Sequence, residues 1–175
     1  MHKYAILAKH LKINDMEKEN FYTLLMRKEN ALDILSGKKK IEVRQSSDYY
    51  EKMFCDKKKL EAFYKQFENW ENQKDFEQKI WLTDTLKDDG IKTLRFTNYN
   101  RTWFLDVEIE NKFYDTFCEY TKQILNEKYN FHDWDDAPTQ EEIAKRAEQG
   151  EKNLPNVIDF FAFVLGKVID TDLNK

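Results

Sequence analysis

The sequence has few residues that break regular structure and few of those that build metal sites or membrane spans. Only 4 Gly and 2 Pro occur among 175 residues, which excludes a collagen-like or low-complexity chain. Cys55 and Cys118 are far apart in sequence and have no Cys or His at metal-ligand spacing, so we expect reduced thiols. The longest apolar run, FFAFVL at 160–165, is too short to span a bilayer, and the N-terminus lacks the features of a signal peptide. These absences predict a cytoplasmic protein that does not contact membranes.

Motifs for several kinds of chemistry are missing as well. The sequence has no P-loop, no nucleotide-binding glycine fingerprint and no Ser/His/Asp motif. The segment 132–136, HDWDD, contains one histidine beside carboxylates but lacks the separate, convergent ligands of a zinc site. We interpret it as a polar loop, and the sequence predicts neither a metal nor a cofactor.

The net charge of the chain differs from that of proteins that bind nucleic acid through many phosphate contacts. The net charge is −4, whereas proteins that neutralise many phosphates are usually basic. The distribution is uneven, because residues 37–59 carry a local charge of +4 and residues 127–151 a local charge of −5. If any surface contacts phosphate, we expect it near residues 37–59.

Aromatic residues are plentiful, with 13 Phe, 9 Tyr and 4 Trp available for a core. The length suits one domain, and no repeat or Pro/Ser-rich linker divides it. We therefore predict a single domain over 1–175. Residues 1–20 form an N-terminal extension that fits a short helix about as well as a strand.

Hydrophobic periodicity predicts the elements. The first half contains a strand at 21–27, a helix from 29 that ends at Gly37, a strand at 40–45 and an amphipathic helix at 56–80 capped by Asp56. The second half contains strands at 91–97 and 102–110 around a turn at 98–100, and a helix around Phe117–Leu125. A further helix at 140–149 follows the capping box Thr139–Glu142, and a final strand at 157–170 has a bulge at Gly166. A short buried helix is the alternative for the last segment. This order is typical of an α+β fold with a small, curled or barrel-like sheet flanked by helices.

The stretch LSGKKKIEVRQ at 35–45 is the best candidate for a site. On a strand, Glu42 and Arg44 share one face while Ile41 and Val43 point into the core. Lys39 precedes them at the turn, so the three charged side chains can converge at one rim of the sheet. Spacing alone allows either a surface ion pair worth about 0–1 kcal/mol or a binding site for a polar ligand.

The pattern Gly37-x-Lys39-x-x-Glu42-x-Arg44 resembles the signature of the ASCH domains, small β-barrels of the PUA-like superfamily. The hairpin at 93–110 and the strand at 159–169 are similar to the central hairpin and terminal strand of that family. The resemblance implies a PUA-like barrel that binds RNA or a nucleotide in a cleft. There Gly37 would let backbone amides approach the ligand, Lys39 and Arg44 would donate to it, and Glu42 would accept from it or orient the lysine.

Two residues of the predicted hairpin extend this hypothesis. Tyr99 and Arg101 lie near the turn, where an aromatic ring and a guanidinium can stack on and bind an unpaired base. We assign Trp103 to the core.

The segment 48–82 is an insertion relative to the compact family pattern. Its helix either packs on an outer face of the barrel with lysines 57–59 in solvent, or it forms a wall of the cleft.

An enzymatic function is the alternative. One branch of the family resembles an amidohydrolase that removes an acyl group from the N4 amine of cytidine, with a threonine nucleophile at the position of Glu42. That nucleophile is missing here, and the branch's later glutamate has no clear counterpart among Glu127, Glu141 and Glu142. We therefore predict a binding module. In the alternative, Lys39 and Glu42 would be catalytic in hydrolysis of a modified nucleoside amide or of RNA.

Overall fold

The computed structural model describes residues 20–68 and 80–173, and its elements confirm the predicted α+β class. The predicted extension at 1–20 lies outside this range except for Asn20. No helix in the described ranges has the length and apolar character needed to cross a bilayer. The elements are β1 (Tyr22–Leu25), α2 (Lys28–Leu35), β2 (Ile41–Gln45), α3 (Asp48–Phe54), α4 (Lys57–Glu68), a 3₁₀ turn (Leu82–Thr85), β3 (Thr93–Thr97), β4 (Phe104–Thr116), α5 (Glu119–Tyr129), α6 (Gln140–Glu148) and β5 (Asp159–Thr171).

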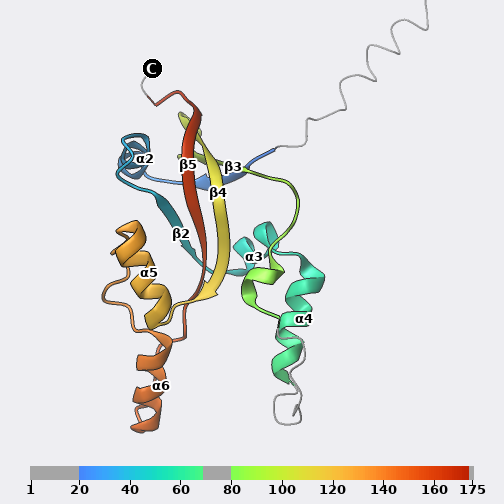
Figure 1. Cartoon of the computed structure of the whole chain (residues 1–175), viewed down its shortest axis with the longest axis vertical. Coiled ribbons are helices and arrows are strands. Elements are labelled where there is room, and N and C mark those ends of the chain that lie inside the picture. The colour runs from blue at the N-terminus through green and yellow to red at the C-terminus, as the bar shows by residue number, and fades with distance from the viewer. Residues whose placement is uncertain (1–19, 69–79, 174–175) are drawn as a thin grey trace, which may run out of the picture.

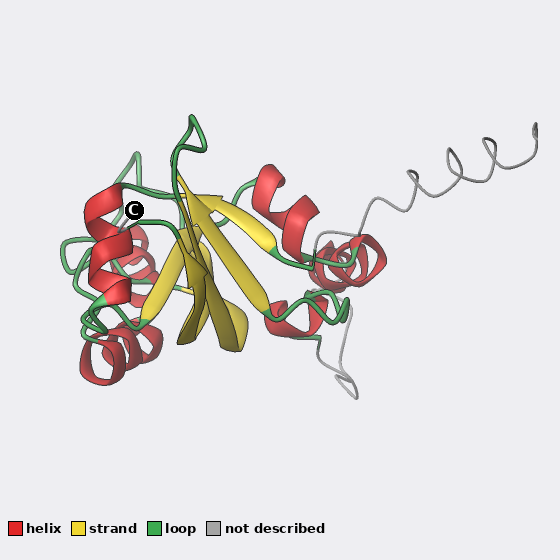
Figure 2. Ribbon diagram, turned by 90° about the horizontal axis from the view of Figure 1, so that it is seen from above, coloured by secondary structure: helices red, strands yellow, loops and turns green. Residues whose placement is uncertain are grey.

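The strands form one curled, five-stranded sheet in the order β1-β3-β4-β5-β2. β1 runs parallel to β3, and every other pair is antiparallel. The long strands β4 and β5 form the spine, with α5 and α6 on one side and α3 and α4 on the other (Figure 1). Figure 2 shows the same sheet from above, between two groups of helices. The predicted curled sheet flanked by helices is confirmed at this level of detail.

The C-terminal segment predicted at 157–170 forms the strand β5, so the alternative of a short buried helix is wrong. The bulge predicted at Gly166 is present. Val107 pairs with Val168 and Ile109 pairs with Leu165, so β5 contains an extra residue around Gly166. A Cβ atom on Gly166 would lie 2.9 Å from Cγ of Glu110, which explains why glycine occupies this position.

Three predicted helix boundaries are confirmed. α2 ends before Gly37, which has φ +75°, a conformation that glycine adopts without a steric penalty. Asp56 Oδ1 accepts hydrogen bonds from the amides of Lys58 and Lys59 at the start of α4. The reciprocal bonds of the Thr139–Glu142 capping box are both present.

The helix predicted at 56–80 is confirmed over 57–68. Residues 69–79 lie outside the described ranges, and residues 80 and 81 are not helical. Strand β4 continues six residues beyond the predicted end at 110.

α3 was not predicted, and it joins the core through aromatic and polar contacts. Phe54 packs against Phe161 and Phe163 with ring centroids 5.1 and 4.9 Å apart. Glu51 Oε1 accepts hydrogen bonds from the hydroxyls of Tyr64 and Tyr114, at 2.9 and 2.8 Å. Burial, together with the bond to Glu51, raises the pKa of Tyr64 to about 12. These contacts tie α3 and α4 to the sheet.

Both faces of β2 are packed, although β2 is an outer strand of the sheet. This corrects the expectation that only Ile41 and Val43 face the core. Ile41 and Val43 belong to a cluster with residues of α5 and the following loop. Glu42 pairs with Phe163 and Arg44 with Phe161, and directly paired residues point to the same side of a sheet. The two charged residues therefore share a face with the main aromatic core, and Glu42 is only 3% exposed.

Candidate ligand-binding site

Lys39, Glu42 and Arg44 form a compact charged cluster, as their spacing suggested. Lys39 Nζ lies 2.9 Å from Glu42 Oε2, and Arg44 Nε lies 2.7 Å from Glu42 Oε1. The Glu42 side chain is 4% exposed, whereas those of Lys39 and Arg44 are 20% and 22% exposed. A buried carboxylate thus holds two cations whose outer parts reach solvent.

The cluster also joins the two outer strands of the curled sheet. Arg44 Nη2 donates to the carbonyl oxygen of Leu25 at 2.7 Å, which links β2 to the end of β1. Glu42 Oε2 and Arg44 Nε are shielded from solvent and make no hydrogen bond of good geometry, although each lies at ion-pair distance from its neighbour. Buried polar atoms with incomplete hydrogen bonding are uncommon, and a role in binding or catalysis is one of the explanations for them.

Gly37 shapes this region but is not among the residues that line the two cavities described below. Its amide donates to the carbonyl of Ile34, and the amides of Lys38 and Lys39 both donate to the carbonyl of Asp33. These amides therefore cap α2, so they do not point toward a ligand as the family resemblance implied. The turn at Gly37 instead places Lys39 beside the start of β2.

The cluster lies on an open cavity of about 650 Å³, here called the first cavity, whose volume is within the usual range for small-molecule sites. Tyr99 lines it from the β3–β4 turn and is 86% exposed. Positive and negative lining side chains are equal in number: the cations are Arg27, Lys39 and Arg44, and the anions are Glu29, Glu42 and Asp133.

Several lining residues were missed by sequence reasoning. Phe131 and Trp134 follow α5 and pack edge to face, with ring centroids 5.6 Å apart. Asn130, with φ 53°, ends α5 and turns the chain toward the cavity. The polar loop was foreseen, and His132 contacts Asp135 within it, but only folding brings the loop beside β2. No group of His, Cys, Asp or Glu in the described ranges is arranged to hold a metal ion.

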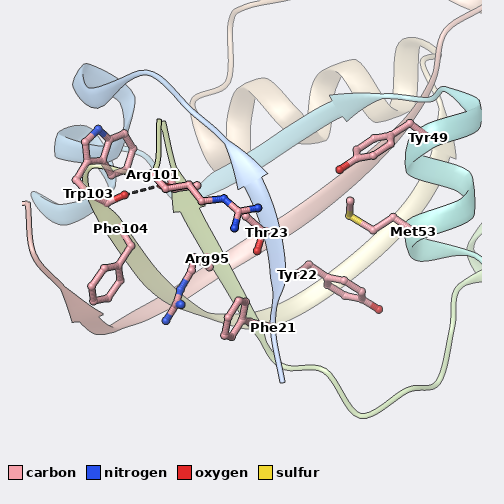
Figure 3. A pocket seen from close by; sticks show the side chains of 10 residues that line it. Phe21, Tyr22, Thr23, Tyr49, Met53, Arg95, Arg101, Trp103 and Phe104 are labelled. Atoms are coloured by element: carbon pink, nitrogen blue, oxygen red, sulfur yellow. Dashed lines mark hydrogen bonds between the residues drawn. The ribbon is translucent and has the colours of Figure 1, made fainter. Parts of the chain in front are cut away.

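Arg101 lines a different cavity from Tyr99, Lys39, Glu42 and Arg44. This second cavity measures about 460 Å³ and is shown in Figure 3. Trp103 lines it and is 7% exposed, in keeping with its assignment to the core. Apart from Gly37, the predicted ligand-binding residues therefore divide between two cavities.

The helical insertion does not line the first cavity in its described part. Lysines 57–59 at the start of α4 are exposed, as expected for a helix with its charges in solvent. Tyr49 and Met53 of α3 line the second cavity instead.

Comparisons of the chain with protein-family models, with curated proteins and with solved structures gave no match. Inferences about function therefore rest on the residues and geometry of this chain.

Proposed function

We propose that the first cavity binds a nucleobase, either in a nucleotide or within single-stranded RNA. The observation that carries this proposal is the pairing of a buried Glu42 with Lys39 and Arg44 at a cavity whose edge carries the exposed ring of Tyr99. Lys39 and Arg44 offer donors to the carbonyl oxygens of a base edge, and Tyr99 offers a flat face for stacking. The resemblance of 37–44 to the ASCH signature supports the same conclusion.

The charge balance of the cavity favours a base over a phosphate as the group recognised. Equal numbers of cationic and anionic side chains line it, so the net attraction for a phosphate is small. Binding should then depend only weakly on salt, because few phosphate contacts would release few counterions.

Two features favour binding over hydrolysis. None of the described residues that line the first cavity is Ser, Thr or Cys, so the small hydroxyl or thiol nucleophile that usually carries acyl transfer is missing there. Lys39 lies against Glu42 Oε2, and that oxygen is shielded from the solvent from which it would have to activate water.

The test is fluorescence anisotropy with a labelled short single-stranded RNA at low salt, with competition by nucleoside monophosphates to separate the two ligand forms. Tyr99→Ala should weaken binding by at least about fivefold, because a base–aromatic stack contributes about 1–3 kcal/mol. Lys39→Met should weaken it by about tenfold through loss of a charge-assisted hydrogen bond. Tyr120→Ala and Lys167→Met are matched controls, since both residues are exposed and line neither cavity.

Absence of binding by the wild type, or unchanged affinity in both cavity variants, would contradict the proposal. A separate incubation with N4-acetylcytidine, followed by chromatography, tests the enzymatic alternative. We expect no product. Product that falls by roughly 10²–10⁴-fold in Glu42→Gln would replace the binding function with a hydrolase.

A further inference from the structure

The second cavity lies along the first half of β1, whereas the first cavity reaches the last residue of that strand. Trp103 and Phe104 lie at one end of it, and Tyr49 and Met53 of α3 face it from the other (Figure 3). Phe21 and Tyr22 add further rings. Aromatic side chains on several sides of the cavity suit an aromatic ligand, which can stack on an exposed ring such as Tyr49 or meet the others edge to face.

One of the two arginines at this cavity is already neutralised. Arg95 donates to both carboxylate oxygens of Asp106, each at 2.7 Å. Its guanidinium also lies over the rings of Phe21 and Phe104, at 4.0 and 4.8 Å from their centroids. Arg95 therefore forms a rigid wall of the cavity and adds little net charge to it.

Arg101 supplies the positive charge that remains. None of the described residues lining the second cavity is acidic, and Arg101 is exposed. Its side chain extends over β1 toward Thr23, whose hydroxyl is a further potential donor (Figure 3). A guanidinium and a hydroxyl that line the same cavity are suited to one carboxylate group.

The turn that carries Arg101 is fixed by its own hydrogen bonds. Asn98 Nδ2 donates to Thr102 Oγ1 at 2.7 Å, and the Thr102 amide donates to Asn98 Oδ1 at 2.8 Å. Arg101 has φ 53°, a conformation that residues other than Gly, Asn and Asp rarely adopt. The turn thus keeps an arginine where Gly, Asn or Asp would be less strained, and its hydrogen bonds fix the backbone from which the Arg101 side chain extends.

We propose that the second cavity binds a small aromatic carboxylate, with its carboxylate on Arg101 and Thr23 and its ring among the aromatic side chains. The volume of about 460 Å³ suits one or two fused rings. This site is separate from the proposed nucleobase cavity and does not depend on it.

The test is a titration of ¹⁵N-labelled protein with indole-3-carboxylate and, as the neutral counterpart, indole-3-carboxamide. The indole N–H signals of the four tryptophans are followed by NMR and assigned with Trp→Phe variants. We expect a saturable shift of the Trp103 signal and an affinity for the carboxamide that is about tenfold lower.

Arg101→Asn removes the guanidinium and suits the positive φ, so it should fold normally. It should reduce affinity for the carboxylate about tenfold and leave that for the carboxamide unchanged, whereas Lys167→Gln should alter neither. An unmoved Trp103 signal at millimolar ligand, equal affinity for the two compounds, or an unaffected Arg101→Asn would overturn the proposal. The same titration with benzoate and with phenyl phosphate compares the two kinds of anion. Tighter binding of phenyl phosphate would overturn the assignment of the cavity to carboxylates.

Discussion

Replacing Glu42 with Gln tests whether the charged cluster is a coupled unit of the fold. The change keeps the size and one carbonyl acceptor but leaves Lys39 and Arg44 side by side without their shared anion. Removing one partner of a fully buried ion pair costs about 3–5 kcal/mol, and an exposed pair contributes about 0–1 kcal/mol. Because Glu42 is 4% exposed and its partners 20% and 22%, we expect an intermediate loss of about 2–3 kcal/mol.

Thermal and urea unfolding, followed by circular dichroism, measure this loss. For a chain of this size, 1 kcal/mol corresponds to about 2–4 °C, so the Tm should fall by roughly 4–12 °C. Glu148→Gln is the matched control, because Glu148 is exposed on α6 and should change the free energy of unfolding by less than about 0.5 kcal/mol.

A double variant separates coupling from a local packing defect. In Lys39→Met/Glu42→Gln, only one cation remains, so the combined loss should be smaller than the sum of the single losses. A change below about 0.5 kcal/mol in Glu42→Gln, or strict additivity in the double variant, would refute the reasoning that the cluster is electrostatically coupled.

Two further predictions concern stability. Thr139→Ala should lower the free energy of unfolding by about 1 kcal/mol in urea denaturation, because the buried Thr139 side chain caps α6 through the amide of Glu142; an unchanged midpoint would contradict this. Burial raises the pKa of Asp159 above its usual value, so the native state loses stability as the pH rises and this carboxyl ionises. Asp159→Asn retains an oxygen that accepts the hydrogen bond from the Thr116 hydroxyl. It should raise the Tm by roughly 1–4 °C at pH 7 and leave the Tm unchanged below about pH 3.5. A difference in Tm that does not depend on pH would contradict this.

Much of the fold was predictable because its signals are local. Gly37 ends α2 and Thr139 begins α6 through backbone geometry and hydrogen bonds within four residues. The apolar character of 157–170 and the glycine at 166 predicted a bulged strand for similar reasons, and β5 is observed over Asp159–Thr171. By contrast, α3 and the last six residues of β4 carry weaker patterns, and contacts distant in sequence stabilise both, including the bond between Glu51 and Tyr114.

The composition of the candidate site was only partly predictable. The strand period placed Glu42 and Arg44 on one face, but it did not reveal that this face is shared with Phe161 and Phe163. Phe131 and Trp134 gave no sequence signal because a loop after α5 brings them to the first cavity.

The sequence by itself determined where most of the helices and strands form and which charged residues can meet along β2, because these depend on backbone conformation and short-range spacing. The tertiary structure decided that Glu42 is buried and that Tyr99 and Arg101, two residues apart, serve different cavities. The physical reason is that burial and cavity shape depend on how a curled sheet brings β1 beside β2. The hydrogen bond from Arg44 to the carbonyl of Leu25 links the two strands there.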